Sequence, residues 1–115
     1  MELTPHGNNA DIKVSVLADE EMRKLGFTDY SESRWYFCKR LLDTISFNFT
    51  IEKDGSDWAI DILDEVFLQP YDYQLILSKR DDCKFAYELR ERVEDLMDKF
   101  AECGIVSGHS RYDYI

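Results

Sequence analysis

The chain has 115 residues, of which 44% are hydrophobic and 14% aromatic, and its 24 acidic against 14 basic residues give a formal net charge of −10. This length and composition suffice for one folded domain with a single core, and they exclude a disordered acidic tail. The charge opposes direct binding to nucleic acid or to an anionic membrane, since phosphate contacts require clustered Lys and Arg.

The N-terminal part of the chain predicts a short strand and a short helix. Residues 1–10 contain Pro, Gly and an Asn pair and are expected to form a loose terminus. Apolar and polar residues alternate over residues 12–16, which indicates a strand. Asp19 is expected to cap a helix over residues 20–25, with acids in its first turn and bases in its last. Gly26 then suits the left-handed position that follows a helix.

The centre of the chain predicts a β-hairpin. Apolar and polar residues alternate over residues 46–52, which is the period-2 pattern of a half-buried strand. Asp54-Gly55 is the signal for a two-residue type I′ turn, whose two central positions both need φ > 0. Counting outward from this turn places six apolar side chains on one face, in the pairs Ile51 with Trp58, Phe49 with Ile60 and Phe47 with Ile62.

A third strand is predicted over residues 35–42, joined to the hairpin by the two-residue turn that follows it. With this turn, Tyr36 and Cys38 are expected to face the core. Gln69-Pro70 is expected to end any strand that runs through residues 66–68. These strands together predict an antiparallel β-meander.

The C-terminal part predicts a long helix with one apolar stripe. The stripe recurs at spacings of four, four, three and four residues, at Phe85, Leu89, Val93, Leu96 and Phe100. Asp81 or Asp82 is expected to cap its start, and Gly104 with Ile105 to end it in a Schellman motif. Its exposed face is expected to carry i,i+4 pairs of opposite charge, namely Glu88/Arg92, Arg90/Glu94 and Asp95/Lys99.

These elements predict a single α+β domain over residues 1–115. An antiparallel β-meander carries the long C-terminal helix on one face, with the short helix near the N-terminus and a C-terminal tail over residues 106–115. No apolar run reaches transmembrane length, and the N-terminus lacks the basic-then-apolar layout of a signal peptide. A cytoplasmic location is therefore expected.

One segment combines acidity with apolar residues. Between Asp54 and Leu77 the chain has six acids and no Lys or Arg, together with the Trp, Ile, Leu and Phe residues that folding requires. This composition predicts unneutralised carboxylates in fixed positions, which favours a basic partner such as the nucleic-acid channel of another protein. The candidate partner-binding residues are the acids Asp54, Asp57, Asp61, Asp64, Glu65 and Asp72, with Tyr71 and Tyr73 as contact area.

No sequence motif for catalysis is present. The chain contains no GxSxG, HExxH, P-loop, GxGxxG or CxxC pattern, and its three cysteines at irregular spacings indicate no disulfide framework. A zinc site with three Cys and one His fails on distance, because Cys83 and Cys103 lie at opposite ends of a helix about 30 Å long. Cys103 and His109 remain the candidate metal ligands or thiol–base pair, and no cofactor is expected.

Sequence motifs over residues 25–73 resemble those of a group of small proteins. The stretches LGFTD, WYFCKRL, ISFNFTIEKDGSDWAIDILDE and FLQPYDYQ, with GIVSGH after the C-terminal helix, are similar to small uncharacterised acidic proteins of prophages and mobile elements of Gram-positive bacteria. Proteins of this size, acidity and origin include anti-CRISPR proteins, some of which imitate the charge of nucleic acids.

The resemblance implies a non-enzymatic phage or mobile-element protein that inhibits a nucleic-acid-handling protein by occupying a basic site. A Cas9-type effector, with its basic channel, is a natural target for such an inhibitor. A small metal- or thiol-dependent enzyme and a structural phage protein are the alternative functions.

Overall fold

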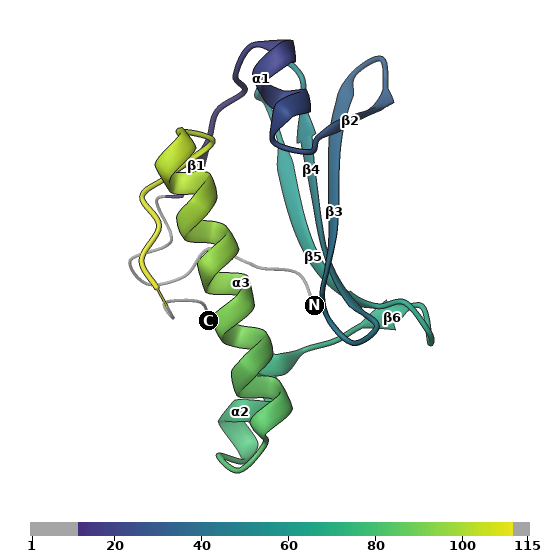
Figure 1. Ribbon diagram of the computed structural model, residues 1–115, viewed down its shortest axis with the longest axis vertical. Coiled ribbons are helices and arrows are strands. Elements are labelled where there is room, and N and C mark those ends of the chain that lie inside the picture. Colours follow the sequence, from purple (N-terminus) through teal and green to yellow (C-terminus); the bar gives the residue numbers. More distant parts are fainter. Residues whose placement is uncertain (1–11, 112–115) are drawn as a thin grey trace.

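The computed structural model describes residues 12–111, except for the side chain of Tyr30 (Figure 1). The predicted loose N-terminus, residues 1–10, lies outside this range. The strands are β1 (Lys13–Val14), β2 (Thr28–Ser31), β3 (Arg34–Leu42), β4 (Ile45–Glu52), β5 (Trp58–Asp64), β6 (Gln69–Pro70) and β7 (Val106–Ser107). The helices are α1 (Asp19–Lys24), α2 (Tyr73–Lys79) and α3 (Lys84–Cys103).

Five strands form one antiparallel sheet in the order β2-β3-β4-β5-β6, so that each strand pairs with its neighbour in the sequence. β1 and β7 form a separate antiparallel pair. α3 packs across one face of the large sheet, and none of the described helices covers the opposite face, which we call the open face (Figure 1). The predicted α+β fold, a meander with a long C-terminal helix on one face and a short helix near the N-terminus, is confirmed.

The register of the β4–β5 hairpin is as predicted, although its turn is not. Ile51 lies opposite Trp58, and the two further predicted pairs also form. The loop has four residues instead of two, because the N–H of Glu52 still donates to the carbonyl of Asp57 at 2.9 Å. Only Gly55 has a positive φ in this loop, +78°, so the turn is not type I′. The loop is longer by one residue on each side, which leaves the register unchanged.

The prediction that Tyr36 and Cys38 face the core is wrong. Trp35 and Phe37 are buried instead, and Cys38 is exposed. The cause is a register shift between Arg40 and Leu42, where β3 has one more residue than β4. Such a bulge changes which side chains point inward, because side chains alternate between the two faces of a strand.

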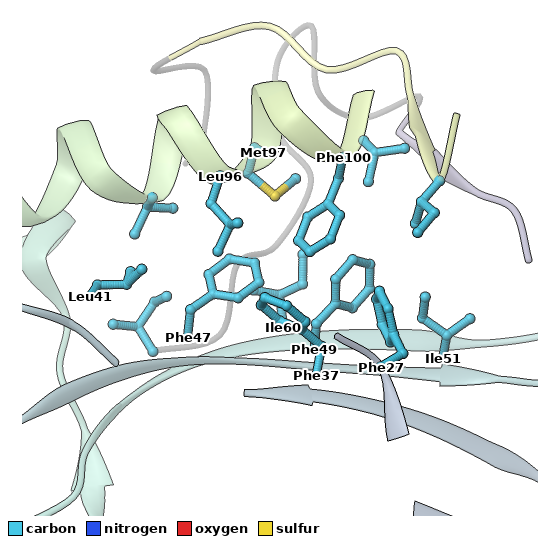
Figure 2. Close-up of a cluster of buried hydrophobic side chains, with 14 of the residues drawn as sticks. Phe27, Phe37, Leu41, Phe47, Phe49, Ile51, Ile60, Leu96, Met97 and Phe100 are labelled. Atoms are coloured by element: carbon cyan, nitrogen blue, oxygen red, sulfur yellow. The ribbon is translucent and has the colours of Figure 1, made fainter. Parts of the chain in front are cut away.

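Phe100 on α3 lies at the centre of an aromatic cluster between the helix and the sheet (Figure 2). Its ring centroid is 5.1 Å from that of Phe37 and 5.5 Å from that of Phe49. Phe27 and Phe47 follow at 5.8 Å and 6.2 Å. The other members of the predicted stripe are also buried, except that Phe85 is half-buried; they are Leu89, Val93 and Leu96. The stripe therefore faces the core, as expected.

The predicted endings of α1 and α3 are confirmed. Gly104 has a φ of +91°, and the N–H of Ile105 donates to the carbonyl of Phe100 at 3.1 Å, which is the long hydrogen bond of a Schellman motif. Gly26 likewise follows α1 with a φ of +102°. Glycine suits both positions because it has no Cβ to oppose a positive φ.

The predicted N-caps of α1 and α3 are wrong. The residues that precede these helices are Ala18 and Cys83, and neither side chain forms a capping hydrogen bond. Asp19 lies within the first turn of α1, where its charge still favours the positive end of the helix dipole. Asp82 binds a neighbouring arginine side chain before α3 begins.

Candidate interaction surface

The acidic segment, which we define as residues 54–72, remains largely without neutralising bases in the folded chain. Within residues 12–111, only Glu65 of its six acids forms an ion pair, with Nη2 of Arg40 at 2.7 Å. This guanidinium lowers the pKa of Glu65. The segment therefore keeps five carboxylates that no Lys or Arg side chain contacts.

Four of these five carboxylates are held in position by backbone N–H groups. Asp54 accepts a hydrogen bond from the N–H of Ser56 at 2.9 Å, and Asp57 from that of the residue after it at 2.9 Å. Asp64 accepts from the N–H groups of residues 66 and 67, and Asp72 caps α2. These bonds fix the side chains but leave the negative charge unpaired. The side chain of Ser56, followed by its backbone N–H, lowers the pKa of Asp54.

The acids extend along β5 and beyond both of its ends. Asp57 and Asp61 point to the open face, because they alternate with the inward-facing residues of the strand. They are about 13 Å apart at about 3.3 Å per residue. Asp54 lies in the loop before β5, whereas Asp64 and Asp72 lie toward the opposite end of the strand. Asp64 has the parity of the inward-facing Ile60 and Ile62, so it does not share the open face with Asp57 and Asp61. The carboxylates are thus spread along β5 and its flanking loops and do not form a compact cluster, and we call the five together the row.

The two tyrosines assigned to the same surface have different environments. Tyr71 is half-buried, and its ring meets that of Phe85 edge-on at 5.7 Å. Tyr73 is fully buried, and burial raises the pKa of its hydroxyl. The prediction that Tyr73 supplies contact area for a partner is therefore wrong. It fails because Tyr73 begins α2, a short helix that the sequence interpretation did not include and that packs against α3.

A further feature of this surface is the apolar turn, residues 66–68, which joins β5 to β6. The sequence allowed a strand through these residues that Gln69-Pro70 would end, but Val66, Phe67 and Leu68 form an exposed turn and Gln69–Pro70 form β6. Leu68 has a φ of +52°, a left-handed conformation that costs a non-glycine residue about 1–2 kcal/mol. Three consecutive apolar residues resemble a buried strand in sequence, so periodicity could not reveal this turn.

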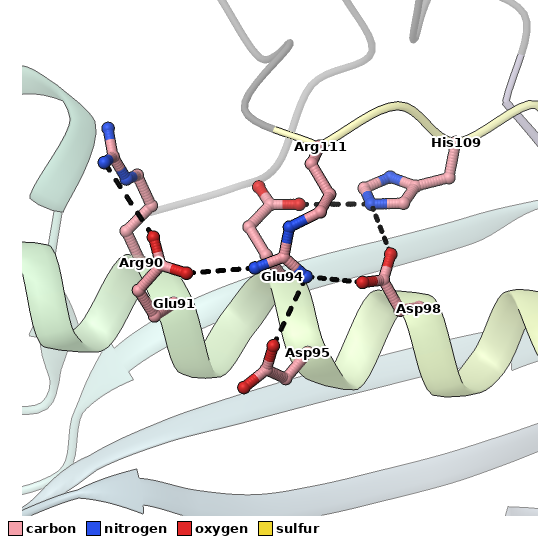
Figure 3. Close-up of polar contacts among 7 residues, drawn as sticks. All are labelled: Arg90, Glu91, Glu94, Asp95, Asp98, His109 and Arg111. Carbon is pink, nitrogen blue, oxygen red and sulfur yellow. Dashed lines mark hydrogen bonds and ion pairs between the residues drawn. The ribbon is translucent and has the colours of Figure 1, made fainter.

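A cluster of charged and polar side chains, buried only at His109 and Glu94, lies along α3 (Figure 3). Nε2 of His109 is 3.1 Å from Oε2 of Glu94 and 3.6 Å from Oδ1 of Asp98. The side chains of His109 and Glu94 are 3% and 0% exposed. Arg111 reaches Glu91 at 3.0 Å and also contacts Asp98. We call these five residues the C-terminal clasp, because they hold residues 109–111 against the helix.

The clasp changes two of the predicted charge pairs on α3. Glu94 is buried beside His109 and does not lie on an exposed face with Arg90. Asp95 pairs with Arg111 at 3.3 Å in place of Lys99. The third predicted pair, Glu88/Arg92, is present at 3.2 Å. The expected C-terminal tail therefore begins with an ordered segment, consisting of β7 and the clasp.

Cys103 and His109 do not form a pair. The thiol of Cys103 donates to the carbonyl of Phe100 at 3.3 Å, whereas His109 contacts carboxylates. Over residues 12–111 no group of three or more His, Cys, Asp or Glu side chains has the arrangement of a metal site. The geometry therefore gives no support to either role proposed for Cys103 and His109.

Three surface cavities within residues 12–111 are smaller than most ligand pockets. One of about 250 Å³ lies between β3 and α3, lined by Lys39, Arg92 and Lys99 among others. Two more, of about 160 and 230 Å³, lie on the open face. Ligand pockets in proteins usually measure about 300–1,000 Å³.

Comparisons of the chain with protein-family models, with curated proteins and with solved structures find no match. The resemblance to mobile-element proteins therefore stays a prediction from sequence. None of the described helices is long and apolar enough to cross a membrane.

Proposed function

We propose that the chain is a non-enzymatic interaction protein whose acidic segment occupies a basic site on a nucleic-acid-handling protein and thereby inhibits it. The observation that carries this proposal is the row of five carboxylates that have no basic partner among residues 12–111, four of them fixed by backbone N–H groups. Preorganised charges lose little conformational entropy on binding, so more of their interaction energy contributes to affinity.

The partner chemistry follows from the sign and arrangement of the charges. Sites that bind nucleic acids are lined by Lys and Arg that contact phosphates, and a row of carboxylates competes for the same side chains. The net charge of −10 accelerates encounter with such a site. The resemblance to mobile-element proteins makes a Cas9-type effector in the cytosol the target that we would test first.

Neutralising four carboxylates of the row tests this proposal without removing the hydrogen bonds that their side-chain oxygens accept. Asparagine keeps the accepting oxygen, so Asp54→Asn, Asp57→Asn, Asp61→Asn and Asp64→Asn in one variant should leave the fold intact. We expect this variant to bind a purified Cas9-type effector at least about tenfold more weakly than the unmodified chain does at 0.1 M salt. The difference should shrink toward 1 M salt, where the Debye length falls from about 10 Å to about 3 Å.

The matched control changes the net charge equally at exposed positions elsewhere, by Glu20→Gln, Glu21→Gln, Glu88→Gln and Glu102→Gln. We expect the control to retain most of the affinity. Equal losses in the two variants would show that net charge alone drives binding, and the acidic segment would then have no special role. Absence of any complex with the unmodified chain would rule out this target.

A gain of affinity is expected from Arg40→Gln. Arg40 is the base that neutralises Glu65, so its removal adds a sixth unpaired carboxylate to the row. The pKa of Glu65 should rise toward its ordinary value, because the guanidinium that lowers it is gone. The same binding assay and an NMR titration measure the two effects. Arg92→Gln, which releases Glu88 on α3, is the control and should leave the affinity nearly unchanged.

A further inference from the structure

The apolar turn exposes three large side chains in succession. Val66, Phe67 and Leu68 are 62%, 71% and 78% exposed. Scattered exposed apolar residues are common on protein surfaces, but a contiguous group of this kind marks a contact site. The turn projects from the edge of the sheet, on the side away from α3 (Figure 1). It therefore contributes nothing to the core between the sheet and α3.

The turn is held in one shape from both ends. Oδ1 of Asp64 accepts the N–H of Val66 at 3.0 Å and that of Phe67 at 3.3 Å. The N–H of Glu65 donates to the carbonyl of Thr44 at 3.0 Å, and β5 pairs with β6 directly after the turn. Leu68 keeps its left-handed backbone within this frame. The exposed side chains contribute no burial to folding and the left-handed backbone of Leu68 costs free energy, and this combination in a fixed turn is typical of a functional site.

The charges around the turn indicate which kind of partner surface it can bind. Asp61, Asp64 and Asp72 lie near it in the chain, and none has a basic partner within the described range. Two copies meeting at their turns would bring these acids together, and an anionic membrane would repel them. A pocket that is apolar inside and bordered by Lys or Arg complements both the side chains and the charges.

We propose that the apolar turn is the anchor of the interaction surface, and that Phe67 and Leu68 insert into an apolar pocket with a basic rim on the partner protein. This proposal rests on the proposed function and specifies its partner. An apolar anchor inside a polar rim is the usual distribution of binding energy at an interface. The acids then orient the encounter, and the turn slows dissociation.

Photocrosslinking from the turn identifies the occupant. The probe is p-benzoylphenylalanine placed at the position of Phe67 and irradiated in the source cell. We expect a crosslink to a protein peptide whose apolar residues are bordered by Lys or Arg. A crosslink to a second copy of this chain, to lipid or to a peptide without bases, or no crosslink at all, would overturn the proposal.

Affinity measurements with the purified crosslinked partner separate the turn from the acids. Phe67→Ser should weaken binding about tenfold or more at both 0.1 and 1 M salt, since apolar contacts are not screened. Leu75→Ser, which changes another exposed apolar residue on α2, is the matched control and should have little effect. If Phe67→Ser binds like the unmodified chain, the anchor fails. If the asparagine variant binds like the unmodified chain and Phe67→Ser does not, the proposed role of the acidic row is wrong and that of the apolar turn is supported.

Leu68→Gly provides a second variant with opposite effects on stability and binding. Glycine adopts a φ of +52° without strain, so the melting temperature should stay the same or rise. Affinity should fall by about tenfold or more, because the side chain is lost. Unchanged affinity in this variant together with unchanged affinity in Phe67→Ser would show that the turn makes no contact with the partner.

Discussion

Phe100→Ala is expected to lower the free energy of unfolding by about 3–5 kcal/mol. Phe100 is 2% exposed, and four other phenylalanine rings surround it with centroids 5.1–6.2 Å away. Truncation removes the burial of the ring and leaves a cavity that close-packed neighbours fill only in part. Because domains of this size are stable by about 5–15 kcal/mol, the loss is a large fraction of the total.

Urea denaturation of purified protein measures this loss, and Phe67→Ala is its matched control. The control makes the same chemical change at a side chain that is 71% exposed, so its unfolding free energy should stay within about 0.5 kcal/mol of the unmodified chain. Equal destabilisation by the two substitutions would contradict the placement of α3 across the sheet, and with it the assignment of the open face.

His109→Ala is expected to destabilise the fold by about 1–3 kcal/mol, because it leaves a buried carboxyl group without the polar group beside it. The carboxylate of Glu94 is 0% exposed and would lose the group that lies 3.1 Å away. Asp98 adds negative charge at the same site, which increases the cost. Chemical denaturation at neutral pH measures the effect.

A second substitution separates loss of the pair from loss of packing. Glu94→Gln in the His109→Ala background replaces the carboxyl group by a neutral amide and should recover part of the stability, giving a measurable coupling energy in a double-mutant cycle. Arg111→Ala is the control at a more exposed member of the clasp, and it should cost at most about 1 kcal/mol. If His109→Ala unfolds like the unmodified chain, residues 109–111 do not pack on α3 as described.

The fold was predictable where local patterns and global packing agree. Alternation in residues 46–52 and the position of Gly55 determined the hairpin register, although the loop is longer than a type I′ turn. The stripe on α3 and its ending at Gly104 followed from periodicity and from the need for a left-handed residue. Each of these features depends on neighbours close in sequence.

The errors arose where one residue or a distant contact decides the structure. The bulge before Leu42 has no sequence signal, yet it exchanges the inward and outward residues of β3. The clasp depends on the contact between His109 and Glu94 on α3, which local charge spacing does not indicate. At the candidate site, the sequence indicated the acids without basic partners. It did not indicate that Tyr73 is buried between α2 and α3.

Hydrogen exchange of the chain, free and bound to a purified Cas9-type effector, tests the central claim most directly. We expect the amides of residues 52–72 to exchange more slowly in the complex, with the largest change at residues 64–68, because the acidic row and the apolar turn form the contact. The amides on the exposed side of α3 should exchange at the same rate in both states. Slower exchange confined to α3, with residues 52–72 unchanged, would contradict the account.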